Sequence, residues 1–366
     1  MRRERNICDL VVGSIRKVLL RVSAAVIMAG AVLLTGCSMI DEDRSDCAEP
    51  ESEVDYELEL VTNISTEITT KLETETTLTT QADIELAAEL RDYLGGIFTD
   101  FAHDVDLSFY DTQGDSLRLQ HDRHIMDANQ ASYSLNLPKR EYMHLAVANI
   151  VDNELVGLER DERCHTSSLA QTVRDTIDSH TTGLFTARAP MNVLEGVDQT
   201  FQVRLYMANC ATALVIDTRG LDTRGMRVFS SGFASGFSIC DSAYQFAAVP
   251  PMVRTTRLEA GQGSRLAFCS VNFPSEKEHR TRTVIETEEP FITAADEKSI
   301  WTFEVYVPTN NGKITRTLIC VMEPLNAGQF KIVKVWLNED GSLSTDASEV
   351  STSVTLDWKP GLVIDY

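Results

Sequence analysis

Basic residues and aromatic residues are both scarce in this chain of 366 residues. There are 33 Lys and Arg against 55 Asp and Glu, which gives a formal net charge of −22. Proteins that bind nucleic acid present a basic surface to the phosphates, so we expect no nucleic-acid partner. Protein cores take up most aromatic side chains, so the 14 Phe, 9 Tyr and 3 Trp leave few for stacking on sugars.

Recognisable catalytic and metal-binding motifs are also missing. No two cysteines form a CxxC pair, and the pair His121 and His124 has no third ligand at a metal-site spacing. Ser235, in the segment GFASGFS, is one place late for the nucleophile of a G-x-S-x-G turn. We therefore expect no enzyme, metal, cofactor or small-molecule substrate. A lipid-anchored hydrolase, with a catalytic triad assembled in space, stays open as an alternative.

One apolar run, residues 22–34, lies near the start of the chain and follows three basic residues. The run is too short for a membrane-spanning helix, which needs about 20 residues, so it predicts an export signal. The segment LTGC, which ends at Cys37, resembles the bacterial lipobox. That resemblance implies removal of residues 1–36 and lipidation of the Cys37 thiol. A plain secretory signal with a chance cysteine is the alternative.

Residues 37–50 are expected to form a lipidated acidic tether. Asp41, Glu42 and Asp43 resemble the acidic surface-export signal of Bacteroidetes lipoproteins, and a solvated linker is the alternative. An acidic chain is repelled by anionic headgroups, so attachment to a membrane would depend on the lipid. We therefore expect a lipid-anchored protein of the outer membrane that is exposed at the cell surface.

Six cysteines follow Cys37, and in an oxidising compartment they are disulfide candidates. Six cysteines allow 15 complete pairings, and the sequence does not choose among them. Buried free thiols are the alternative for those on apolar strands. The six are Cys47, Cys164, Cys210, Cys240, Cys269 and Cys320.

Strand patterns dominate the remaining sequence. Residues 54–61 alternate apolar and mostly acidic side chains, and residues 105–119 predict a hairpin. Seven further strand-like segments follow residue 200, whereas residues 152–190 are polar with few strand signals. A helix is predicted from apolar residues at three- and four-residue steps, namely Ile84, Ala87, Leu90, Leu94, Ile97 and Phe101. The pattern predicts an all-β chain of two β-sandwiches in tandem, residues 51–190 and 191–366, with a small helical insertion in the first.

Three parts of the sequence carry a family resemblance. They are the lipobox with a second cysteine ten residues on, the segment DVDLSFYDTQGDSL, and the segment FTARAPMNVLEGVDQTFQVRLYMANCATALVID. Together they resemble the fimbrillin-associated anchor subunit family of Bacteroidetes, over most of residues 37–366. The Thr- and Glu-rich and helical stretch at 62–102 departs from that family and looks like an insertion.

The resemblance implies two transthyretin-like β-sandwiches held by lipid at the outer membrane. It implies a fimbrial subunit that attaches the fimbrium to the cell and helps set its length, with a fimbrillin stalk subunit as partner. In that system, stalk subunits exchange strands after an Arg-specific protease removes their first strand. An anchor keeps its N-terminus, so we expect the C-terminal strand to be the exchanged one, with Val354, Leu356 and Trp358 alternating on one face. An ordinary last core strand is the alternative.

Two other functions are consistent with the sequence. A surface glycan-binding lipoprotein of a polysaccharide-uptake system would need several aromatic side chains on one open face. A tip or stalk subunit of the same fimbrial system would be cut after an arginine, and a cut after Arg44 would release the protein from its lipid.

Overall fold

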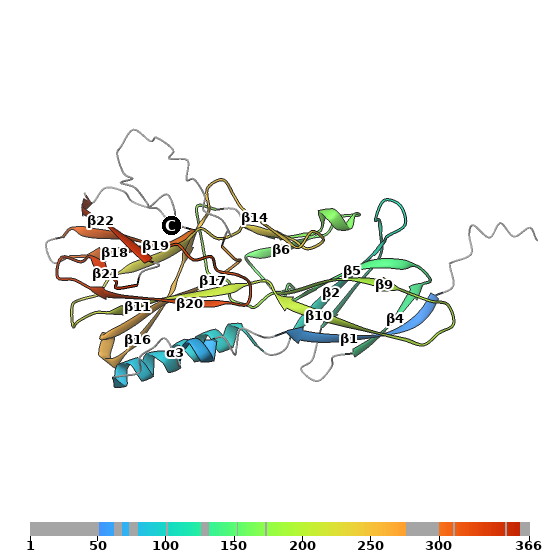
Figure 1. The fold of residues 1–366 in the computed structure, drawn as a ribbon, viewed down its shortest axis with the longest axis horizontal. Coiled ribbons are helices and arrows are strands. Elements are labelled where there is room, and N and C mark those ends of the chain that lie inside the picture. Colours follow the sequence, from blue (N-terminus) through green and yellow to red (C-terminus); the bar gives the residue numbers. More distant parts are fainter. Residues whose placement is uncertain are drawn as a thin grey trace, which may run out of the picture. The chain divides into compact units, whose positions relative to one another are not determined.

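A computed structural model of the chain describes residues 51–61, 68–72, 80–99, 102–125, 132–151, 153–172, 174–275, 300–309, 312–347 and 350–358. The predicted signal, the tether, Cys37 and Cys47 lie outside these residues. The described strands form sheets of seven, five, six and four strands (Figure 1). This arrangement confirms the all-β prediction with tandem sandwiches.

The seven-stranded sheet contains the first strands of the described chain, in the order β3-β2-β5-β9-β10-β1-β4. Strand β1 pairs in parallel with β10 and antiparallel with β4. Val54, Tyr56 and Leu58 are buried on one face, as the alternation predicts. The strands are β1 (Glu51–Val61), β2 (Asp104–Asp111), β3 (Arg118–Ile125), β4 (Ser132–Pro138), β5 (Glu141–Ala148), β9 (Phe185–Asn192) and β10 (Gln199–Met207).

This seven-stranded sheet folds over its own core. Two strands separate β1 from β5 in the sheet order, yet the ring centroids of Tyr56 on β1 and His144 on β5 lie 5.0 Å apart. Phe109 of β2 stacks on His144 with the ring centroids 4.7 Å apart. Because residues on distant strands meet across the interior, the two ends of the sheet form the two layers of a sandwich.

The five- and six-stranded sheets face each other over a second core. One buried cluster contains Leu214 and Phe268 from the five-stranded sheet and Trp301 and Phe303 from the six-stranded sheet. The five-stranded sheet contains β16 (Thr256–Ala260), β17 (Arg265–Asn272), β11 (Cys210–Asp217), β20 (Phe330–Leu337) and β21 (Leu343–Ser344). The six-stranded sheet contains β22 (Val350–Trp358), β19 (Ile314–Val321), β18 (Trp301–Pro308), β12 (Arg227–Ser231), β15 (Met252–Arg254) and β8 (Thr176–Ile177).

The predicted helix is α3 (Gln81–Ile97), and its first turn is fixed by a capping box between Thr80 and Asp83. It buries Leu86, Ala87, Leu90, Leu94 and Ile97, as the periodicity predicts for four of these residues. Ile84 is the exception, because 47% of its side chain is exposed. Phe101 lies outside the described residues.

Helix α3 covers the five-stranded sheet, although in sequence it lies between two strands of the seven-stranded sheet (Figure 1). The Tyr93 hydroxyl donates to Thr256 Oγ1 of β16 at 2.8 Å. Arg265 of β17 donates from Nε to Asp83 at 2.7 Å. The insertion therefore completes the second sandwich by burying the outer face of its five-stranded sheet.

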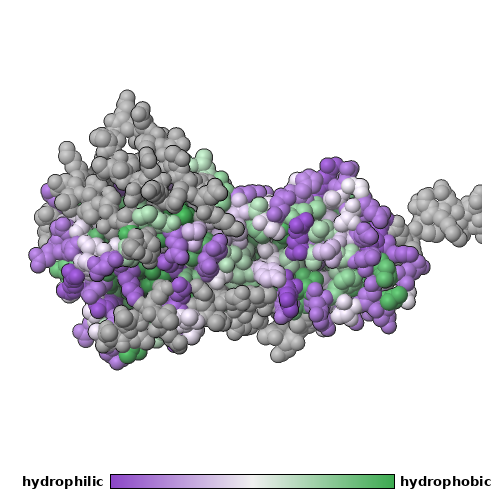
Figure 2. Space-filling view, viewed as in Figure 1, coloured by the Kyte–Doolittle hydropathy of each residue, from purple (hydrophilic) through white to green (hydrophobic). Residues whose placement is uncertain are grey.

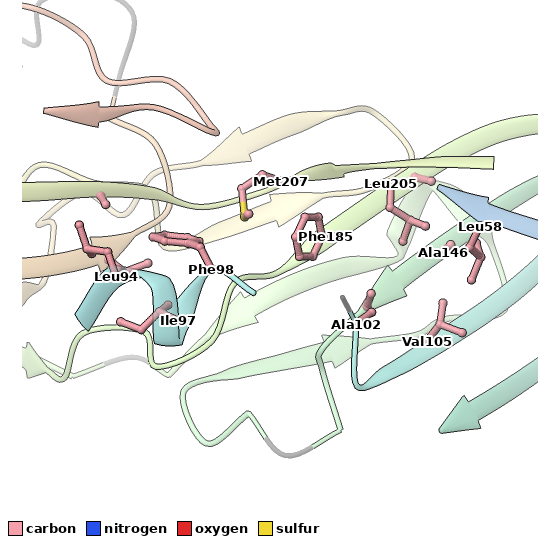
Figure 3. Close-up of a cluster of buried hydrophobic side chains, with 14 of the residues drawn as sticks. Leu58, Leu94, Ile97, Phe98, Ala102, Val105, Ala146, Phe185, Leu205 and Met207 are labelled. Carbon is pink, nitrogen blue, oxygen red and sulfur yellow. The ribbon is translucent and has the colours of Figure 1, made fainter. Parts of the chain in front are cut away.

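The end of α3 also packs against the core of the first sandwich. In Figure 3, Phe98 and Met207 lie between Leu94 of α3 and Phe185 of β9. All four side chains belong to one buried cluster that continues into the seven-stranded sheet. The apolar interior is therefore continuous from the helix to the first sandwich.

A small four-stranded sheet covers the outer face of β2 and β5. Its core includes Tyr110, Leu145 and Val147, which explains why every residue of β2 is buried. It contains β6 (Val156–Glu159), β7 (Ser168–Gln171), β13 (Gly236–Ser238) and β14 (Ala243–Gln245).

The prediction of few strands in residues 152–190 was wrong, because β6, β7, β8 and the start of β9 lie there. Three of these strands are only two to four residues long, too short for an alternation to be recognised. The division at residues 190 and 191 stays a prediction. Strand pairs β7 with β13 and β8 with β15 link segments from both sides of it.

Candidate strand-exchange edge

The predicted exchange strand lies at the edge of a sheet. Strand β22 is the end strand of the six-stranded sheet and pairs antiparallel with β19, from Val350 opposite Val321 to Trp358 opposite Ile314. An end strand presents one row of backbone groups that its own sheet does not pair. The C-terminal strand therefore occupies a position from which a strand can be withdrawn without splitting the sheet.

A β-bulge interrupts this strand near its end. Val354 pairs with Thr317, but Trp358 pairs with Ile314, and the register shifts between Arg316 and Ile314. Thr317 and Ile314 are three residues apart and so belong to opposite faces of β19. The alternation expected for Val354, Leu356 and Trp358 on one face stays a prediction.

Strand β19 is held independently of β22. Eight residue pairs connect it to β18, from Trp301 opposite Val321 to Pro308 opposite Ile314. The Thr317 hydroxyl accepts from the Leu343 backbone N–H at 3.2 Å, and the Thr315 hydroxyl donates to the Asp340 carbonyl at 2.7 Å. Because these contacts do not involve β22, β19 would keep its place and offer its backbone to another strand.

An ion pair joins β19 to β18, its neighbour on the side away from β22. Arg316 of β19 and the Tyr306 hydroxyl both donate to the Glu304 carboxylate of β18. Burial, with the nearby Glu304 charge, raises the pKa of Tyr306 well above its usual range. Burial by itself lowers the pKa of Arg316, but the charge and hydrogen bond of Glu304 together with those of Tyr306 outweigh it, so the pKa is raised. No motif in the sequence indicates this group, although the alternate positions of Glu304 and Tyr306 on one strand, with Arg316 on the next, could have predicted it.

The other end of the described chain, β1, is held on both sides. It makes eight residue pairs with β10 and seven with β4. The first arginine after Arg44 is Arg91, which lies inside α3 between the buried residues Leu90 and Leu94. A cut after Arg44 would leave β1 in place, and the next arginine at which a cut could release β1 lies in this packed helix.

Among the described residues there is no group of three metal-ligating side chains, and no helix there is long and apolar enough to cross a membrane. The disulfide candidates among the described residues are all buried, namely Cys164, Cys210, Cys240, Cys269 and Cys320. On the face shown in Figure 2, apolar side chains are scattered in small groups among hydrophilic ones.

No family model matches this chain, and no curated protein matches its sequence. Several solved structures do match. One is a proposed polysaccharide-binding protein from Bacteroides thetaiotaomicron, with 11% identity, a TM-score of 0.50, and coverage of 82% of this chain and 98% of that chain. The fimbrial anchor protein Mfa2 of Porphyromonas gingivalis matches with 11% identity and a TM-score of 0.42, covering 70% and 77%. A fimbrial assembly protein from Parabacteroides distasonis matches with 13% identity and a TM-score of 0.37, covering 85% and 100%.

At these identities the similarity concerns the fold. The match at a TM-score of 0.50 covers nearly all of the other chain, so a Bacteroides protein has a fold similar to that of this chain. Function has to be argued from the strands and the sequence signals.

Proposed function

We propose that this protein is a lipid-anchored fimbrial subunit that holds a fimbrium to the outer membrane and helps set its length. The proposal is based on the sequence resemblance to fimbrillin-associated anchor subunits. The observation that carries it is the contrast between the two terminal strands. Strand β1 is enclosed between two neighbours, whereas β22 lies at a sheet edge.

The enclosed first strand supports an anchor rather than a processed stalk subunit. A stalk subunit must lose its first strand to open a groove, and here an Arg-specific cut that released β1 would fall within α3. An anchor must instead keep its N-terminus, because Cys37 would carry the lipid. The geometry of β1 is consistent with that requirement.

The edge position of β22 supports strand exchange at the C-terminus. Backbone hydrogen bonds along β19 would supply affinity to a fimbrillin strand, and the side-chain pockets would supply specificity. In exchange, β22 would be free to complete the groove of the next subunit. The strand partner would be the fimbrillin stalk subunit.

Substitution Cys37→Ala tests the lipid anchor. We expect most of the protein to leave the outer-membrane fraction and the fimbriae to be shed with it, because no other membrane attachment is proposed. The measurement is fractionation with an intact mass of the wild type, which should begin at an acylated Cys37. Cys47→Ala is the control and should stay at the membrane. A wild-type mass that begins after an internal arginine and carries no lipid would instead make this a stalk or tip subunit.

Deleting residues 354–366 tests strand donation. The variant keeps Val350 opposite Val321, so we expect a folded, lipidated protein that no longer co-purifies with fimbrillin. Circular dichroism and urea unfolding check the fold. Thr223→Ser, a conservative change far from β22 in sequence, is the control for expression and should retain the fimbrium. A folded deletion variant that still retains the fimbrium would contradict donation by this strand.

Glycan binding at the cell surface is the second candidate, and one solved structure of similar fold is a proposed polysaccharide-binding protein. Tyr206 is 56% exposed and is the aromatic residue among the exposed large apolar side chains of the described parts. The Trp336 ring has the Arg219 guanidinium 5.0 Å from its centre, so one of its faces is covered. Stacking on a sugar chain uses several open rings, so the described residues favour the fimbrial role.

A further inference from the structure

Two cysteines that are far apart in the sequence meet in the small four-stranded sheet. Cys164 begins the 3-10 helix η2 (Cys164–Thr166), and Cys240 follows β13. They are 76 residues apart, and their Sγ atoms lie 3.2 Å from each other. Both side chains are buried, with 6% and 7% of their surface exposed.

Strand pairing and a hydrogen bond hold the backbone next to both cysteines in place. Ser238 of β13 pairs with Ser168 of β7, and the Ile239 N–H donates to the Ser167 carbonyl at 3.1 Å. The Ser167 hydroxyl in turn hydrogen-bonds the Tyr110 hydroxyl of β2 at 2.6 Å. A disulfide needs its sulfur atoms about 2.05 Å apart, so the two sulfurs need to approach by only about 1 Å.

Unlike Cys164 and Cys240, the cysteines Cys210 and Cys269 lie in two different cores. Cys210 lies in the core between the five- and six-stranded sheets, whereas Cys269 lies in the core beneath α3, on the opposite face of the five-stranded sheet. The Cys210 thiol donates to the Phe273 carbonyl at 3.4 Å. These two cysteines therefore cannot bridge to each other through the sheet.

We propose that Cys164 and Cys240 form a disulfide bond in the exported protein. The two S–H bonds break and one S–S bond forms between Cys164 and Cys240. The two electrons and two protons pass to the disulfide of a thiol–disulfide oxidoreductase of the cell envelope, whose S–S bond breaks to give a dithiol.

The bond would form while the site is still accessible. Burial, with the neighbouring Cys164 sulfur, raises the pKa of Cys240 to about 12, so the folded protein holds this thiol protonated. The thiolate is the reactive form in exchange, so oxidation would be fastest before the four-stranded sheet closes. Once formed, the buried bridge would be shielded from reductants.

The bridge would hold together a sheet with few backbone contacts. Strands β7 and β13 share three residue pairs, and they come from opposite sides of the predicted division at residue 190. A covalent link between η2 and the end of β13 would keep the two hairpins of this sheet together. It would thereby maintain the cover over β2 and β5.

A peptide map tests the bond directly. The full-length protein is isolated from the cell envelope without reductant, its free thiols are alkylated in denaturant, and its peptides are identified by mass. A second sample of the purified protein is first oxidised in a glutathione buffer. We expect a Cys164–Cys240 linked peptide in both samples, while Cys210 and Cys269 are alkylated. Alkylation of both Cys164 and Cys240 in the envelope sample, or a link from either one to Cys47, would overturn the proposal.

Urea unfolding provides a second measurement that does not depend on the fimbrial role. Oxidised wild type should unfold at a higher urea concentration than reduced wild type, whereas Cys164→Ala should unfold at the same concentration in both buffers. The control Cys210→Ala should keep the difference between the buffers. Equal midpoints for oxidised and reduced wild type would contradict a bridge that stabilises the sheet.

Discussion

Acidification from pH 7 to pH 4 should lower the free energy of unfolding by about 3 kcal/mol for each of two buried histidines. Burial lowers the pKa of His144 to about 3, with an opposing hydrogen bond to the Ser108 backbone, and burial lowers the pKa of His180 to about 4. In the unfolded chain both imidazoles take up a proton below about pH 6.5. The unfolded state therefore binds more protons in this window. The stability contributed by the neutral rings is present above pH 6.5 and is lost as the pH falls towards 4 and 3.

Both rings are hydrogen-bonded in the interior. The Tyr56 hydroxyl, whose pKa burial raises, hydrogen-bonds His144 Nε2. At His180, Nδ1 accepts from the Asn209 side-chain amide at 2.7 Å, and Asn209 Oδ1 is already bonded to the Leu184 N–H. A proton on His180 Nδ1 would face this amide donor and lose its partner.

Urea unfolding at pH 7, 6, 5 and 4 measures this effect. His144→Gln should be less stable than wild type at pH 7 but should lose less stability on acidification, because one titrating group is gone. His165→Gln is the control, since His165 is exposed and should leave the pH dependence unchanged. If His144→Gln and wild type lost equal stability between pH 7 and pH 4, the assignment to His144 would be wrong.

The second large effect concerns the helix. Leu90→Ala should lower the free energy of unfolding by about 2–5 kcal/mol, because it leaves a cavity where a fully buried side chain packs beneath the five-stranded sheet. Ile84→Ala on the same helix should change it by no more than about 0.5 kcal/mol, because Ile84 is largely exposed. Urea unfolding at pH 7 with unchanged slope compares the two. Similar small losses for both variants would show that α3 is not part of the cooperative core.

Much of the fold could be predicted from local patterns. The alternation of Val54, Tyr56 and Leu58 indicates a half-buried strand, and the three- and four-residue spacing of Leu90, Leu94 and Ile97 indicates a helix. Both patterns depend on backbone geometry within a few residues, so they appear in the sequence directly. The short strands β6, β7 and β8 could not be found in this way, because they are stabilised by partners far along the chain.

The candidate site could likewise be predicted from the sequence only in part. Lipidation at Cys37 and the role of the last strand are predictions from sequence, and the bulge before Trp358 appears only in the register with β19. The meeting of Cys164 with Cys240 likewise follows from the pairing of β7 and β13, which no spacing in the sequence encodes.

The sequence by itself determined the strand-rich class, the helix and the acidic, weakly aromatic composition, because these follow from residue type and local periodicity. Only the tertiary structure decided that α3 covers the second sandwich and that β1 lies parallel to β10. It also decided that β22 occupies a sheet edge. Those outcomes depend on which apolar faces meet between segments far apart in the sequence. The free energy of burial that selects them depends on the packing of the whole domain.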